Sequence, residues 1–116
     1  MHEMSLVEGI MNTVRISAVA NGIQRVGRIK LIIGKLSMAL PESLDFVFSC
    51  LLQQEPLFAD ATLDIEEKEV VGKCRICSSE FRISESDYQC PDCQVSAIDL
   101  ISGRELYIEF YEGEAQ

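Results

Sequence analysis

The sequence predicts an α+β fold in which two helices pack on a three-stranded sheet. Two stretches repeat apolar residues at spacings of three and four, as a helix with one buried face requires, and three others alternate apolar with polar residues, as a half-buried strand requires. A cysteine-bearing stretch lies before the last of these strands. We therefore predict two domains, one formed by residues 1–69 plus 104–116 and an inserted one formed by residues 70–103.

The first helix is expected over residues 4–22. Ser5 and Glu8 have the spacing of a capping box, in which each side chain accepts a hydrogen bond from the other residue's backbone, and Gly22 suits the left-handed position that ends a helix. The buried face should carry Leu6, Ile10, Val14 and Ala18. The capping box and Gly22 thus indicate a helix over most of this segment.

The second helix is expected to begin at Pro41, because proline is well tolerated in the first turn of a helix. Its buried stripe should consist of Leu44, Val47, Phe48, Leu51 and Leu52. Cys50 lies in the same helix, far along the chain from the other cysteines. A lone cysteine in an apolar helix usually packs as a small hydrophobic residue, so we expect Cys50 in the core.

Three segments have the alternation of strands: residues 26–34, 61–66 and 105–111. In the last of them Leu106, Ile108 and Phe110 alternate with charged or aromatic residues. Two helices and three strands can form a two-layer domain. The last strand would return to the sheet of the first domain after the insert, and the pattern leaves open whether the protein is a monomer or a homodimer.

Composition and charge exclude several classes of protein. The chain of 116 residues is 47% hydrophobic and 25% charged, as in ordinary globular proteins, and no apolar run approaches the ~20 residues that cross a bilayer. A net charge of −9 argues against nucleic-acid binding, which depends on clustered lysine and arginine. The start of the chain lacks the pattern of a signal peptide, so we expect a cytoplasmic protein whose thiols stay reduced.

Two Cys-x-x-Cys pairs are the most specific chemical signal. Cys74 and Cys77 form the first pair, Cys90 and Cys93 form the second, and twelve residues separate the pairs. Each pair can aim two sulfurs at one ion, and two pairs complete the closed tetrahedron of a zinc ribbon. An iron site and disulfide exchange are the competing interpretations. Ser78 and Gln94 stand after the two pairs, where such turns often have glycine.

The first three residues, Met1, His2 and Glu3, offer a second metal site of a different kind. A free terminal amine, the His2 ring and backbone amides can close fused chelate rings around one cation, and planar nitrogen donors suit Ni(II) or Cu(II). His2 is the only histidine in the sequence. The alternatives are a solvated histidine and a Glu3 carboxylate that only stabilises the start of the helix.

Several motifs together resemble the HypA/HybF family of nickel-incorporation proteins for NiFe hydrogenase maturation. They are Met1-His2-Glu3-Met4-Ser5-Leu6, Gly34-Lys35-Leu36-Ser37, Pro41-Glu42-x-Leu44-x-Phe46, the two cysteine pairs and Gly103-Arg104-Glu105-Leu106-x-Ile108. The resemblance runs from Met1 to about Phe110, and the motifs keep their order along the chain.

The resemblance implies a metallochaperone and not an enzyme. It implies that Met1, His2 and Glu3 bind nickel for transfer, and that Cys74, Cys77, Cys90 and Cys93 hold structural zinc. The implied partners are a nickel-delivering GTPase of the HypB type and a hydrogenase large-subunit precursor, with urease as another acceptor. Some relatives carry histidines beside the zinc cysteines, and this sequence has none there.

Two other functions compete with this one. A zinc-ribbon adaptor for protein or nucleic-acid partners would account for the cysteines, although Lys73, Arg75 and Arg82 are outnumbered by acidic residues in the insert. A zinc hydrolase would need an open zinc position, which four cysteine ligands do not leave.

Overall fold

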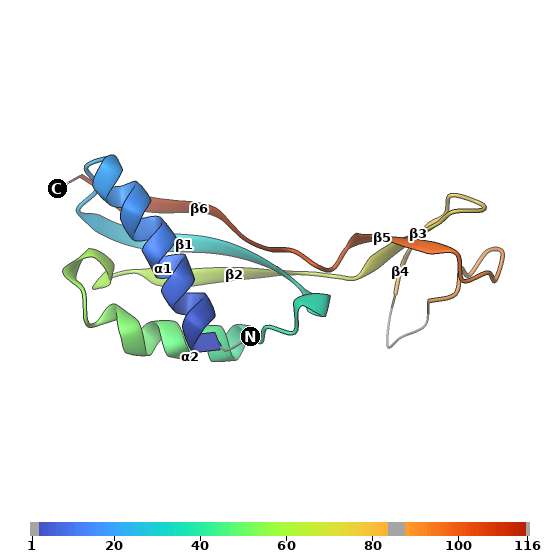
Figure 1. Ribbon diagram of the computed structural model, residues 1–116, viewed down its shortest axis with the longest axis horizontal. Helices are drawn as coiled ribbons and strands as arrows, with labels where there is room; N and C mark the ends of the chain where they lie inside the picture. The colour runs from blue at the N-terminus through green and yellow to red at the C-terminus, as the bar shows by residue number, and fades with distance from the viewer. Residues whose placement is uncertain (1–2, 84–87, 116) are drawn as a thin grey trace. The chain divides into compact units, whose positions relative to one another are not determined.

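The computed structural model describes residues 3–83 and 88–115, and these residues form two compact units. The first unit contains residues up to Ile32, Ala39–Glu66 and the chain from Tyr107 onward; the second contains Ile33–Met38 and Glu67–Leu106. Ile33–Met38 therefore groups with the cysteine-bearing unit, whereas the sequence pattern assigned it to the other domain. The predicted α+β class with two α-helices is confirmed (Figure 1).

Helix α1 spans Glu3–Ala20. The predicted capping box is wrong, because the helix is already formed at Glu3 and Ser5 lies inside its first two turns. The stop is as predicted, since Gly22 has a φ of 70°. The core-facing residues are Val7, Ile10, Met11, Val14 and Ala18, while Leu6 is half-buried. The prediction used a spacing of four alone and therefore missed Val7 and Met11, which widen the buried stripe.

Helix α2 spans Pro41–Leu52, with proline in its first turn. Leu44 and Phe48 are buried, and Val47, Leu51 and Leu52 are half-buried. Cys50 is exposed, so the prediction that it packs in the core is wrong. Only two turns of α2 reach the core, and Cys50 follows Phe48 by two positions, which turns it to the far side of the helix.

A 3₁₀ turn at Pro56–Phe58 follows α2 and buries Phe58 completely. No periodic pattern in the sequence indicated this core residue.

The first sheet has the strand order β2-β1-β6, formed by Thr62–Lys68, Arg25–Gly34 and Leu106–Glu114 (Figure 1). The ion pairs between β1 and β2 advance in the same direction along both strands, from Arg28 with Asp64 to Lys30 with Glu66, as in parallel strands joined through α2. Strand β6 runs antiparallel to β1, since the Gln24 amide donates to the Glu114 carbonyl and Gly27 lies beside the Glu112 carbonyl. The middle strand β1 contributes four adjacent core residues, Leu31 to Gly34.

The second sheet has the order β4-β3-β5, formed by Glu80–Arg82, Val71–Cys74 and Ile98–Ser102. Both pairings are antiparallel; Gly72 lies opposite Phe81 on one side and Leu100 on the other. A β-carbon at Gly72 would come within 2.6 Å of the Ile98 side chain and 2.8 Å of the Ile83 side chain, so a larger residue here would have to displace one of them. This small sheet supports the cysteine loops. Within the described residues, no helix is long and apolar enough to span a membrane.

Candidate metal centre

Two loops of nearly identical backbone geometry carry the four cysteines. In the first loop the Cys74 amide donates to the Ser79 carbonyl at 2.9 Å, and the Ser78 amide donates back to the Cys74 carbonyl at 3.0 Å. In the second, Cys90 and Val95 are joined in the same way at 2.9 Å, and Gln94 donates to Cys90 at 2.8 Å. Each loop is therefore held closed by two backbone hydrogen bonds that do not involve the sulfurs.

The residues after the two pairs adopt left-handed backbone, with φ of 65° at Ser78 and 63° at Gln94. Left-handed backbone favours glycine because a β-carbon crowds the following carbonyl. The sequence therefore places two non-glycine residues where the turn needs a positive φ. The loops still close, so the hydrogen bonds and the sulfur cluster outweigh this local cost.

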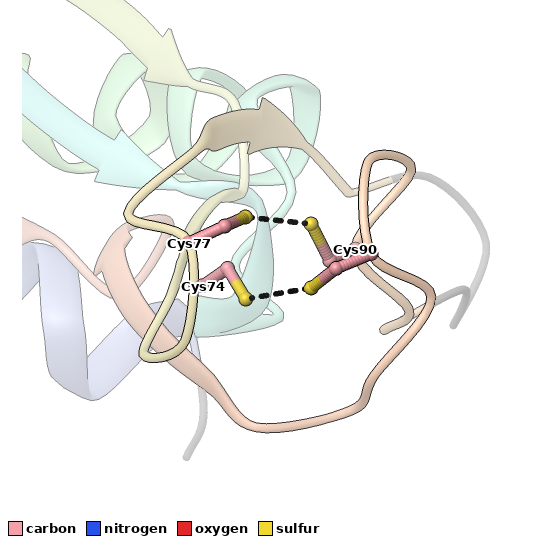
Figure 2. A group of neighbouring side chains, drawn as sticks. Cys74, Cys77 and Cys90 are labelled. Atoms are coloured by element: carbon pink, nitrogen blue, oxygen red, sulfur yellow. Dashed lines mark hydrogen bonds between the residues drawn. The ribbon is translucent and has the colours of Figure 1, made fainter.

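The four sulfurs converge on one point (Figure 2). The Cys74 and Cys93 sulfurs are 3.4 Å apart, those of Cys77 and Cys90 are 3.5 Å apart, and all four lie within 4.8 Å of one another. Bonds of about 2.3 Å to a tetrahedral zinc would place the sulfurs about 3.8 Å apart. The cluster brackets this value, and its S–S separations are far longer than the roughly 2 Å of a disulfide. The donor set therefore fits a closed tetrahedral metal site.

The environment of the loops favours thiolate at the first pair. The pKa of Cys77 is lowered to about 6, chiefly because the Ser79 hydroxyl and then its amide donate to the sulfur. The pKa of Cys74 is lowered by the backbone amide of Cys77. The pKa of Cys93 is raised to about 12, first because its thiol donates to Cys74 and second because it is desolvated. The thiols of the cluster thus share protons through hydrogen bonds. A divalent cation that binds the four sulfurs displaces these protons.

Contacts between side chains support the two loops. The Ser79 hydroxyl also lies within hydrogen-bond distance of the Asp92 carboxylate, which joins the first loop to the second. It has one proton, so it donates to Asp92 or to the Cys77 sulfur at any moment and not to both. Arg75 and Asp99 form an ion pair at 3.5 Å between the first loop and β5. Cys74 and Cys90 are buried while Cys77 is exposed, so one side of the cluster is open to solvent. The serine that tunes Cys77 was not identified from the sequence, since nothing in its spacing distinguishes it.

The predicted N-terminal site lies largely outside the described residues, since Met1 and His2 are not among them. Glu3 is the first residue of α1 and is half-buried. The amide groups of the first helical turn have no acceptor within the helix. A metal that takes the Glu3 amide nitrogen would therefore cost α1 none of its own hydrogen bonds.

The fold and the cluster define a small α+β protein with a four-cysteine metal module. The chain belongs to the HypA family, whose model, described as hydrogenase/urease nickel incorporation, metallochaperone, matches residues 1–113. The family resemblance predicted from the sequence motifs is thus confirmed. Members of this family are metallochaperones that take part in nickel incorporation and hydrogenase maturation.

Individual relatives agree with this assignment. The hydrogenase maturation factor HypA of Moorella thermoacetica is 42% identical over 114 residues, which cover 98% of this chain and 100% of that protein. The factor of the same name from Pelodictyon phaeoclathratiforme is 40% identical over 109 residues, covering 94% and 92% of the two chains. The solution structure of the Ni metallochaperone HypA from Helicobacter pylori covers all of both chains at 26% identity, with a TM-score of 0.69. A second solution structure, of a HypA protein, has a TM-score of 0.74 at 26% identity and covers 100% of this chain and 98% of its own.

Proposed function

We propose that this protein is a cytoplasmic nickel chaperone that carries Ni(II) on Met1, His2 and Glu3 and holds structural zinc on Cys74, Cys77, Cys90 and Cys93. The nickel metallochaperone family to which the chain belongs supports the general activity. The observation that carries the division of metals is the cluster of four sulfurs within 4.8 Å. Because four thiolates complete a tetrahedron, this site needs no donor from residues 1–3.

Zinc at the sulfur cluster would have a structural role. When bound, it neutralises the thiolates and supplies folding energy to a unit with a small apolar core. The described core residues of this unit outside the cysteines include Val70 and Ile83, which are both buried. The chain's own residues prepare the site: Ser79 favours the thiolate of Cys77, and the two backbone-closed loops hold the sulfurs in place.

Nickel at the N-terminal end is the cargo. The Met1 amine, the His2 ring and the amides of residues 2 and 3 would supply nitrogen donors, a set that suits planar Ni(II). The Glu3 carboxylate is then free to act on the dipole at the start of α1. Each donor must lose a proton or stay unprotonated, so affinity falls as pH falls. A site at the end of a chain can be rearranged by a partner at little cost to the fold.

The acceptor is proposed to be a NiFe hydrogenase large-subunit precursor, with a HypB-like GTPase as the partner in nickel delivery. Urease is the other acceptor named in the family's description. Purified apo-precursor and apo-urease, offered separately to nickel-loaded protein, would distinguish the two acceptors. The expected result is nickel transfer to the hydrogenase precursor that requires contact and is not reproduced across a dialysis membrane.

Calorimetric titration of Ni(II) into zinc-loaded protein tests the terminal site. We expect the parent protein to bind one nickel per chain, and both His2→Ala and a variant with residues added before Met1 to bind it far more weakly. Asn12→Ala is the matched control, an exposed polar residue of α1 that leaves the terminus intact. Equal affinity in the parent and His2→Ala would refute the proposed donor set.

A further inference from the structure

Strand β6 is an open edge of the first sheet. It is the last strand in the order β2-β1-β6, and no other strand within the described residues pairs with its outer side (Figure 1). It spans Leu106–Glu114, nine residues without proline or lysine. A long edge strand presents a row of unpaired amide and carbonyl groups, and proteins usually protect such edges with charged residues, above all lysine, with proline or with a covering segment. Among the described residues, β6 has no lysine, proline or covering segment, and its charged side chains are all glutamates.

The side chains of β6 are exposed along most of its length. Tyr107 is 48% exposed and Phe110 37%, and three glutamates of the strand are exposed as well. Tyr111 faces the helices, where its hydroxyl lies 2.8 Å from the Ser17 hydroxyl. Phe110 and Glu112 point to the opposite face, where both lie against Arg28. An added strand would therefore meet an aromatic ring and carboxylates as well as the open backbone.

The charge of β6 is uniformly negative. Its charged residues are Glu109, Glu112 and Glu114, and the sequence contains no lysine or arginine after Arg104. Glu112 forms an ion pair with Arg28 at 3.4 Å, but its side chain is still 64% exposed. Glu109 and Glu114 have no ion-pair partner among the residues that the structure describes. Opposite charges on neighbouring strands are favourable and like charges are not, so this edge selects for a basic neighbour.

The other edge strand, β2, is also open on its outer side in the part of the chain that the structure describes, but its acidic residues are partly neutralised and it has no aromatic residue. Strand β2 also carries carboxylates, but Asp64 and Glu66 are each 3.5 Å from the Lys30 ammonium, and Lys68 lies in the strand itself. A second copy of the chain is disfavoured at β6, because each copy would bring three glutamates to the pair and a total charge of −9. The combination of free backbone, exposed aromatics and unneutralised acid occurs at β6.

We propose that β6 is a docking edge that captures an extended, basic segment of a partner protein as an added strand of this sheet. The backbone supplies the affinity, as in other cases of β-strand addition, and the three glutamates select the charge of the segment. The contacts that support the proposal involve neither the cysteine cluster nor residues 1–3. Its failure would therefore leave the proposed metal sites untouched.

The test uses the zinc-loaded protein and a nine-residue peptide of alternating valine and threonine with three lysines, matched to the length of β6. Backbone amide shifts on titration locate the binding site. We expect shifts concentrated at residues 107–114, slower amide exchange there, and an affinity that falls with added salt. Combined neutralisation by Glu109→Gln, Glu112→Gln and Glu114→Gln should weaken binding by about tenfold or more.

Two controls separate strand addition from attraction to an acidic protein in general. Neutralising the same number of exposed acids on the helices, by Glu8→Gln, Glu42→Gln and Asp45→Asn, should leave the affinity unchanged. A peptide of the same sequence, methylated at alternate backbone nitrogens, should not bind, because it keeps its charge but loses its donors.

Four outcomes of the peptide experiments would overturn the proposal. They are no binding at millimolar peptide, equal binding of the methylated peptide, an equal loss of affinity in the helix control, and shifts confined to residues 62–68. A dimer whose formation shifts residues 107–114 in the absence of peptide would also overturn it, since the edge would then belong to a second copy.

Discussion

A β-carbon placed on Gly34 would lie 2.1 Å from the carbonyl carbon and oxygen of Gly103. Two motifs that are far apart in the sequence, one beginning at Gly34 and the other at Gly103, are therefore in direct backbone contact. The Gly34 amide donates to the Glu105 carbonyl at 2.7 Å, and the Leu36 amide donates to the Gly103 carbonyl at 2.8 Å. The Glu105 carboxylate accepts from the Gly103 amide at 2.8 Å. The backbones of the two motifs approach each other so closely that a side chain at Gly34 would clash, which explains the glycine in that motif.

Gly34→Ala should therefore destabilise the protein, because the added methyl group meets backbone that has no flexible side chain to move aside. Overpacking of this kind costs about 3 kcal/mol. Chemical denaturation monitored by circular dichroism would measure the change. Gly9→Ala is the matched control, since nothing lies within 4 Å of its added carbon, and in α1 it should gain about 0.5–1 kcal/mol. Equal stabilities of the two variants would contradict this account.

The sequence was sufficient for features that rest on periodicity or on spacing. The helices, the strands of the first sheet and the four clustered cysteines follow from these patterns. Predictions from the sequence failed where tertiary contacts decide which residues are buried. Cys50 is exposed because only part of α2 reaches the core, and Phe58 is buried by a single 3₁₀ turn with no repeat to reveal it. The hydrogen bonds from Ser79 depend on loop geometry, which no spacing rule describes.

Ser78→Gly and Gln94→Gly should each stabilise the metal-loaded unit. Both residues have φ near +65°, where glycine avoids the strain of a β-carbon but loses more chain entropy on folding. The balance should be a gain of up to about 1 kcal/mol at each position. Competition with a zinc chelator would reveal it as slower and less complete zinc release. Ser96→Gly, at a described residue without positive φ, should show no gain; a gain there as large as at Ser78 would contradict the explanation.

The Glu69 carboxylate should titrate below its ordinary pKa of 4.5, because the Lys35 ammonium donates to it at 3.0 Å. A carboxylate whose pKa is lowered by folding stabilises the folded state above pH 4.5, and this contribution is lost as the pH falls through the lowered value. Lys35→Met should return the pKa toward 4.5, with Arg82 retaining a smaller effect. Side-chain carbon shifts in an NMR titration would measure both values. An unchanged pKa in Lys35→Met would remove Lys35 as the cause.

Cys74→Ser should abolish zinc binding and disorder the second unit, while leaving nickel binding at residues 1–3 intact. A serine hydroxyl does not ionise at neutral pH, so the variant loses one of four thiolates from a buried position at the end of β3. Structural zinc contributes roughly 10–16 kcal/mol of apparent binding free energy, far more than the unit's small core can replace. Elemental analysis should fall from one zinc per chain to none, and amide signals of residues 70–83 and 88–103 should lose their dispersion. Cys50→Ser, which changes the exposed cysteine of α2, should keep the full complement of zinc. Retention of one zinc by Cys74→Ser would mean that the four sulfurs do not act as one site.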